Sequence, residues 1–188
     1  SNLQAATKQY VDAVVQETEL IEFYSTTADA LGGLYYVMNS TQASAGTMTS
    51  AALSNANNQV VLKSITPIGY PGLANLVAGA YENHVHIFKG GLTTGKVVKL
   101  RWKLYQRVTA GTENLIMTSE DIVVTGLSAT PQIAPIHAVL GSDFTLTADL
   151  SDRLVVYWEV DVSGGGTSVT FNVNVGGTVD SHLMIMIP

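Results

Sequence analysis

Hydrophobic and polar residues alternate along most of the chain from about residue 32, a pattern typical of β-strands that bury one face. The clearest run covers residues 99–108 and has an apolar face and a basic face: Leu100, Trp102, Leu104 and Val108 against Lys99, Arg101, Lys103 and Arg107. The same alternation predicts strands at 81–87, 156–162, 169–175 and 183–187, and weaker ones at 34–38, 59–66, 115–124 and 144–148.

Turn residues separate these segments. Glycine-containing stretches at 90–91, 109–112, 163–166 and 176–177 are typical of tight turns, and residues 126–135 predict a longer connection. Eight or nine short strands without interleaved helices predict an all-β fold. Long crossovers between strand pairs favour a jelly-roll-like antiparallel sandwich.

Residues 3–24 have a different, helical spacing and contain no Gly or Pro. Their apolar residues form a narrow stripe, which favours self-association into a coiled-coil-like trimer. The stripe consists of Leu3, Ala6, Tyr10, Ala13, Val14, Leu20, Ile21 and Tyr24. A helix packed on its own domain's sheet is the alternative. The predicted division is a trimerisation helix at 1–25 and a β-sandwich head at 26–188.

Composition narrows the function classes. Only 13% of the 188 residues are charged, against about 25% in an average soluble domain. The net charge of -6 excludes nucleic-acid binding through bulk charge. No run of 18 apolar residues is present, so no membrane insertion is predicted. The absence of Cys excludes disulfides and thiolate metal sites.

Two patterns carry candidate chemistry. His84 and His86 share a strand face with Glu82 and resemble half of a metal site, but the solvated face of an ordinary strand looks the same, so we assign no metal and no cofactor. Glu159 and Asp161 also share a face, about 7 Å apart by strand rise, as glycosidase carboxylates can. Because the basic face of 99–107 can oppose them, an ion-paired surface is preferred and no catalytic residue is assigned.

Three groups of motifs occur in a consistent order. Residues 98–113 read VKLRWKLYQRVTAGTE and are followed by TSED at 118–121, while DRLVV at 152–156 precedes DSHL at 180–183. Residues 5–13 read AATKQYVDA. The first two groups resemble the C-terminal jelly-roll, receptor-binding heads of tailed-bacteriophage tail fibre proteins, and the third resembles the trimerising helix of such fibres.

The resemblance implies a homotrimeric tail fibre tip on the virion, outside the cell, alongside other virion tail proteins. Such a tip adsorbs the virion to a bacterial surface polysaccharide, either capsule or lipopolysaccharide, without catalysis. Aromatic, amide and carboxylate groups in loop-like segments suit a glycan, which makes Tyr70, Asn75, Asn114 and Asp143 the predicted receptor-binding residues. A structural adaptor head that binds another virion protein and a polysaccharide depolymerase are the alternatives.

Overall fold

The computed structural model describes residues 18–70, 72–90, 95–125, 131–147, 152–166, 168–179 and 181–187. These residues form fourteen β-strands. The strands are β1 (Thr18–Ala28), β2 (Tyr35–Asn39), β3 (Gly46–Thr49), β4 (Ala56–Ile65), β5 (Asn75–Leu76), β6 (Gly79–Gly90), β7 (Lys96–Arg107), β8 (Glu113–Thr118), β9 (Ile122–Thr125), β10 (Gln132–Leu140), β11 (Phe144–Thr145), β12 (Arg153–Gly164), β13 (Thr170–Val175) and β14 (His182–Ile187). Within this part of the chain, no helix is long and apolar enough to cross a membrane.

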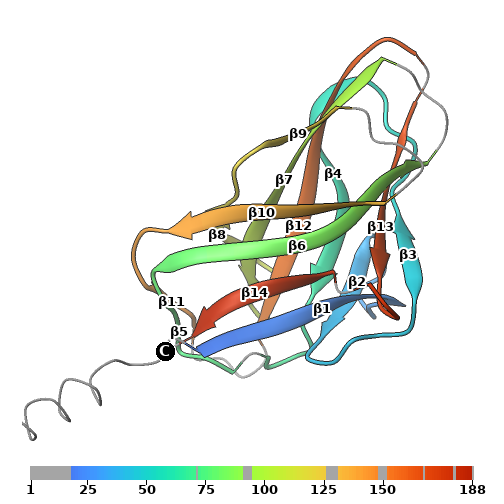
Figure 1. Ribbon diagram of the computed structural model, residues 1–188. Coiled ribbons are helices and arrows are strands. Elements are labelled where there is room, and N and C mark those ends of the chain that lie inside the picture. The colour runs from blue at the N-terminus through green and yellow to red at the C-terminus, as the bar shows by residue number, and fades with distance from the viewer. Residues whose placement is uncertain are drawn as a thin grey trace, which may run out of the picture.

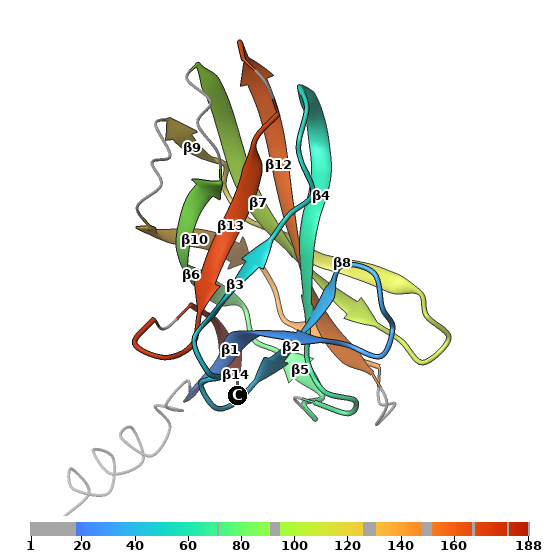
Figure 2. The same ribbon diagram turned by 90° about the vertical axis from the view of Figure 1, so that its right-hand side faces the viewer.

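Twelve of the strands belong to one continuous sheet that folds over on itself (Figure 1 and Figure 2). Its order is β3-β13-β6-β14-β1-β2-β4-β12-β7-β8, with β10 beside β6 and β9 beside β7. Strands β2 and β4 pair in parallel, whereas the others pair antiparallel. Strands β5 and β11 form a separate small sheet. The β6 half and the β12 half of the large sheet thereby enclose the core.

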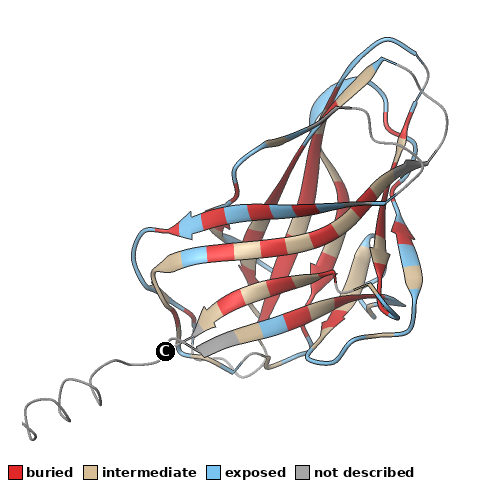
Figure 3. Cartoon of the chain, in the orientation of Figure 1, coloured by how far each residue is buried: buried red, intermediate tan, exposed pale blue. Residues whose placement is uncertain are grey.

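Side chains alternate between core and surface along most strands (Figure 3). Buried aromatic side chains contribute two of the contacts that join the halves of the sheet. The indole Nε1 of Trp102 on β7 donates to the carbonyl oxygen of Ile136 on β10 at 3.0 Å. The ring of Tyr24 on β1 packs edge-on against Trp158 on β12, with centroids 5.7 Å apart. Because these aromatic side chains are fully buried, they supply a large share of the apolar area that stabilises the fold.

The core also holds polar groups around Tyr24. The Tyr24 hydroxyl donates to Asn83 Oδ1 at 2.8 Å, and both residues are fully buried. Glu22 lies on the same face of β1 and is also fully buried, with neither carboxylate oxygen at hydrogen-bond geometry to a partner. Burial raises the pKa of Glu22 to about 7, and the Tyr70 phenol opposes that rise. The fold therefore favours the neutral acid at this position.

The predicted N-terminal helix is wrong for residues 18–25, which belong to β1. This strand pairs with β14 on one side and β2 on the other. Tyr24 points into the core, Leu20 packs against it, and Ile21 is 37% exposed, so these three residues share no trimer seam. The remaining predicted seam residues, Leu3, Ala6, Tyr10, Ala13 and Val14, lie outside the described residues. The predicted domain boundary at 25/26 falls inside β1.

The predicted jelly-roll-like sandwich of eight to nine antiparallel strands is also wrong, since the large sheet alone has twelve strands and contains a parallel pair. Strand β10 occupies part of the connection expected at 126–135. Pro135 lies inside it and has no N–H to donate. It is tolerated because β10 pairs only with β6 among the described strands, so one edge of β10 needs no donors.

Candidate functional site on the outer face of strands β7 and β12

Strands β7 and β12 pair along their full length and present charged side chains outward. Trp102 and its even-numbered neighbours point into the core, so the odd-numbered residues of β7 point away from it. The register places Arg101 opposite Glu159 and Lys99 opposite Asp161, as the sequence predicts for a basic strand that opposes an acidic one. We call this surface the charged face. It comprises Tyr35, Asn58, Lys63, Lys99, Arg101, Lys103, Tyr105, Arg107, Glu113, Leu115, Asp121, Val123, Tyr157, Glu159 and Asp161.

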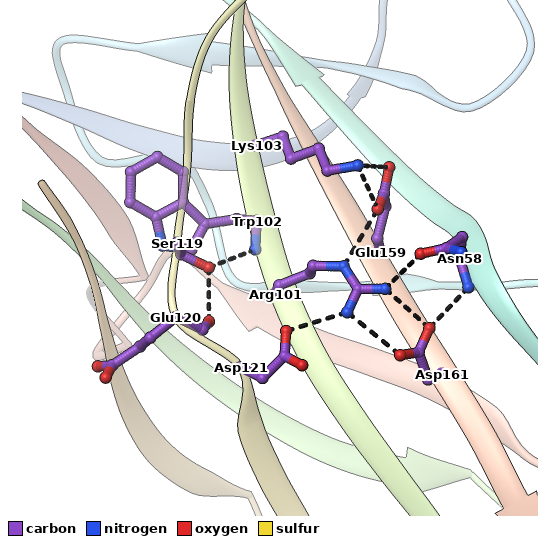
Figure 4. A network of polar contacts seen from close by, with 9 residues as sticks. All are labelled: Asn58, Arg101, Trp102, Lys103, Ser119, Glu120, Asp121, Glu159 and Asp161. Atoms are coloured by element: carbon purple, nitrogen blue, oxygen red, sulfur yellow. Dashed lines mark hydrogen bonds and ion pairs between the residues drawn. The ribbon is translucent and has the colours of Figure 1, made fainter. Parts of the chain in front are cut away.

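Arg101 is the centre of the charged face (Figure 4). Its Nη2 donates to Asp161 Oδ1 at 2.8 Å and to Asn58 Oδ1 at 2.6 Å. Its Nη1 donates to Asp121 Oδ1 at 2.9 Å, and its Nε to Glu159 Oε2 at 3.3 Å. The Arg101 side chain is only 10% exposed, so these bonds form largely out of water. Charge-assisted bonds of this kind hold a guanidinium in a single orientation.

The network lowers the pKa of one of its acids, Asp161. Hydrogen bonds from the Arg101 side chain, and then from the Asn58 backbone N–H, lower the pKa of Asp161. Glu159 is bound by the same guanidinium and also by Lys103, whose Nζ lies 2.8 Å from Glu159 Oε2. A glycosidase needs one carboxyl that keeps its proton near neutral pH. Because one guanidinium binds both Glu159 and Asp161, they are not arranged as a general acid and base.

A tyrosine cluster continues the charged face around Glu113. Tyr35 donates to Glu113 Oε1 at 2.7 Å, Tyr157 donates to Oε2, and Arg107 Nη1 lies 2.9 Å from Oε1. Burial pushes the pKa of Glu113 upward, but these bonds outweigh it and lower the pKa. Lys63 Nζ lies over the rings of Tyr157 and Tyr35, 4.1 and 4.6 Å from their centroids. The cluster is thus half-buried and ordered by its own polar contacts.

Two exposed apolar side chains flank this polar surface. Leu115 on β8 pairs with Tyr105 and is 51% exposed, and Val123 on β9 pairs with Lys99 and is 54% exposed. Tyrosine and arginine with exposed aliphatic neighbours are typical of protein interfaces, where Tyr and Arg are enriched. The charged face therefore combines ordered polar side chains with two exposed aliphatic ones.

The structure disperses the four residues predicted to bind a receptor. Asn75 and Asp143 lie near each other, because β5 pairs with β11 and Asp143 Oδ1 accepts from the Ala78 N–H at 2.8 Å. Tyr70 is half-buried, and its phenol interacts with Glu22 rather than standing free in a loop. Asn114 is exposed on β8, where it follows Glu113 in the chain and pairs with Gln106. Sequence reasoning missed that cluster because Tyr35, Glu113 and Tyr157 are far apart in the chain.

Histidine and carboxylate side chains also meet on the opposite half of the sheet. His137 on β10 has Nε2 at 3.2 Å from Glu82 and Nδ1 at 3.3 Å from Glu120. Both ring nitrogens face carboxylates, so neither is placed to take a proton from a nucleophile. Among the described residues, no three His, Cys, Asp or Glu side chains are positioned to share a metal ion.

Comparison with known proteins gives matches of fold only. No protein-family model and no curated protein sequence matches the chain. Solved structures that match include a CocE/NonD family hydrolase from Staphylococcus aureus, with TM-score 0.58, 12% identity and coverage of 93% of this chain and 37% of that one. An α-amino acid ester hydrolase matches with TM-score 0.54, 12% identity and coverage of 90% and 36%. An aminopeptidase from the marine sediment archaeon Thaumarchaeota archaeon matches with TM-score 0.55, 12% identity and coverage of 92% and 37%.

These matches contradict the predicted function. We expected a non-enzymatic, receptor-binding tail fibre tip, whereas the matched proteins are named as hydrolases and an aminopeptidase. The predicted coiled coil is likewise contradicted where β1 replaces it. The chain spans little more than a third of the length of each matched protein. The bacteriophage resemblance, the predicted partners and the virion location are tested by none of these findings and stay predictions.

Proposed function

We propose that this chain is the β-sheet unit of a hydrolase that cleaves ester or aminoacyl bonds. The carrying observation is the match of at least 90% of the chain to part of three proteins that are named as hydrolases or as an aminopeptidase. An α-amino acid ester hydrolase and an aminopeptidase both act next to an amino acid. That shared chemistry selects amino acid esters and aminoacyl amides as the first substrates to test.

The charged face gives the unit its role in this proposal. About two thirds of each matched protein lies outside the matched part, so further chain accompanies the matching β-sheet unit in those proteins. In this chain, a preordered surface of Tyr, Arg and Lys with exposed Leu115 and Val123 suits such a neighbour. The charged face accordingly docks the β-sheet unit against the rest of the hydrolase and fixes the position of one relative to the other.

The decisive experiment assays the product of the complete reading frame that encodes this chain. Its substrates are p-nitrophenyl acetate, an amino acid methyl ester and an aminoacyl p-nitroanilide. We expect hydrolysis of at least one substrate at more than about tenfold the rate in buffer, well within the range of enzymatic acceleration. A folded product that hydrolyses none of the three would overturn the proposal.

A variant on the charged face tests the docking role in the same protein. Leu115→Asp should reduce the specific activity about tenfold, because a carboxylate in a packed interface loses its hydration without gaining a partner. The matched control is Val139→Asp on β10, which is 73% exposed on the other half of the sheet and should change activity less than about twofold. Equal losses in both variants, or no loss in Leu115→Asp, would contradict docking through this face.

A further inference from the structure

The inner face of the large sheet carries several fully buried polar atoms that have no hydrogen-bond partner among the described residues. They include both carboxylate oxygens of Glu22, the amide Nδ2 of Asn83 and the indole Nε1 of Trp158. All three residues are fully buried. Because buried polar atoms almost always have a partner, in the protein or in ordered water, such a concentration of unpartnered atoms requires an explanation.

Strand pairing brings Glu22 and Asn83 to the same part of the core. Glu22 on β1 lies opposite Leu183 on β14, and Leu183 lies opposite Asn83 on β6. These three strands lie side by side (Figure 1). Residues directly opposite each other on paired strands point to the same side of the sheet, and Leu183 is fully buried. Glu22 and Asn83 therefore both point inward, on either side of one leucine.

Tyr24 links this row to Trp158 on the other half of the sheet. It follows Glu22 by two residues on the same face of β1, and its hydroxyl donates to Asn83 Oδ1 at 2.8 Å. The Tyr24 ring packs edge-on against the indole of Trp158, with centroids 5.7 Å apart. The unpartnered atoms thus belong to three residues that all neighbour Tyr24.

Small rearrangements of the protein do not satisfy these atoms. Turning the Asn83 amide by 180° would place Nδ2 toward the Tyr24 hydroxyl and leave Oδ1 without a partner instead. The Tyr70 phenol interacts with Glu22, but neither carboxylate oxygen is at hydrogen-bond geometry to it. Whichever way the amide points, polar atoms around Tyr24 stay unsatisfied by the described part of the chain.

The unpartnered atoms define the chemistry of a molecule that can bind them. Asn83 Nδ2 and Trp158 Nε1 can only donate, so both require an acceptor. The Glu22 carboxyl has at least one oxygen that requires a donor, whether it is ionised or protonated. The ligand must therefore donate and accept hydrogen bonds at once, and water is the smallest molecule that does so. A buried water typically makes about three hydrogen bonds to otherwise unsatisfied groups, and three such groups are present here.

We propose that Glu22, Asn83 and Trp158 line an internal hydration site around Tyr24, in which ordered water connects the Glu22 carboxyl to Asn83 Nδ2 and Trp158 Nε1. The three residues come from β1, β6 and β12. The water therefore adds a polar connection between the two halves of the sheet, inside a core that is otherwise mainly apolar.

A high-resolution crystal structure of the chain tests the site directly. We expect ordered water within about 3.2 Å of a Glu22 carboxyl oxygen and of Asn83 Nδ2. Absence of density between these two groups would overturn the site, and so would a direct hydrogen bond between them. Density for a molecule larger than water would overturn the choice of ligand.

Variants locate the water in solution, where magnetic relaxation dispersion counts long-lived internal water molecules. The double variant Glu22→Met/Asn83→Leu replaces both polar groups with apolar side chains of similar size, and should lose about one or more such waters per chain. The matched control is Met38→Leu, which changes a fully buried residue opposite Tyr24 on β2 without removing a polar group. It should keep the water count of the parent.

An unchanged water count in the double variant, or an equal loss in Met38→Leu, would contradict the hydration site. Circular dichroism melts show whether each variant is folded. If the double variant does not fold, the crystal structure of the parent chain decides the question, because it needs no substitution.

Discussion

Replacing Arg101 with methionine should lower the free energy of unfolding by about 3–5 kcal/mol, the usual cost of removing one partner from a buried ion pair. Methionine fills similar space but leaves Glu159, which is 5% exposed, with only Lys103 as a charged partner. Asp161 loses the bonds that chiefly lower its pKa. Its carboxylate should therefore protonate at a higher pH than in the native protein. Urea unfolding at neutral pH measures the loss of stability.

Arg107 offers a matched control on the same face of the same strand. The Arg107 side chain is 21% exposed. When Arg107 is replaced, Glu113 still accepts hydrogen bonds from the hydroxyls of Tyr35 and Tyr157. Arg107→Met should therefore cost less than about 1 kcal/mol, as for a more exposed pair. Adding Glu159→Gln to the Arg101→Met background should recover part of the lost free energy of unfolding, because the buried carboxylate of Glu159 is then replaced by a neutral amide. Similar costs for Arg101→Met and Arg107→Met would refute the central role of Arg101.

Glu22 should make the protein less stable as pH rises through the neutral range. Its pKa is raised from 4.5 to about 7, so the folded chain holds a proton that the unfolded chain releases. The stabilisation is fully present below about pH 4.5, and it is lost as pH rises to about 7. We expect this carboxyl to account for about 2 kcal/mol between those limits, after discounting for screening by solvent.

Two variants isolate the contribution of Glu22. Glu22→Gln should remove the fall in stability between about pH 5 and pH 7.5, since the amide does not titrate. Tyr70→Phe removes the phenol that opposes the rise in the pKa of Glu22, so it should extend the fall to higher pH. Unfolding free energies measured across this range for the three proteins make the comparison. If Glu22→Gln kept the slope of the parent, another group would have to be responsible.

The sequence predicts the strands in which apolar and polar residues alternate strictly, and it does not predict β1 and β10, where that alternation is interrupted. Strands β7 and β12 were placed within a few residues, because their apolar and charged faces are cleanly separated. The spacing of Leu20, Ile21 and Tyr24 predicts a helix where β1 lies, because Ile21 on the outer side adds an apolar residue at helical spacing while inward-facing Glu22 breaks the period of two. Strand β10 was missed because Pro135 is acceptable only at an edge, and edges are set by topology.

The candidate site was predictable only in part. The opposition of Arg101 to Glu159 and Asp161 follows from two amphipathic strands with complementary charge, once they are assumed to pair. The tyrosine cluster depends on the parallel pairing of β2 with β4, which places Tyr35 opposite Lys63. No local sequence pattern predicts that pairing. The contact of His182 with His84 likewise depends on β14 lying beside β6. Contacts set by long-range strand order are the part that periodicity does not reveal.

The position of β14 between β1 and β6 has a consequence for synthesis on the ribosome. The final described strand fills the gap between one of the earliest strands and a central one, so backbone donors and acceptors on both neighbours stay unsatisfied until residues 182–187 have been made. Residues 182–187 must therefore emerge before β14 can join β1 to β6. Until then the facing edges of β1 and β6 are unpaired, and unpaired strand edges favour association with other chains.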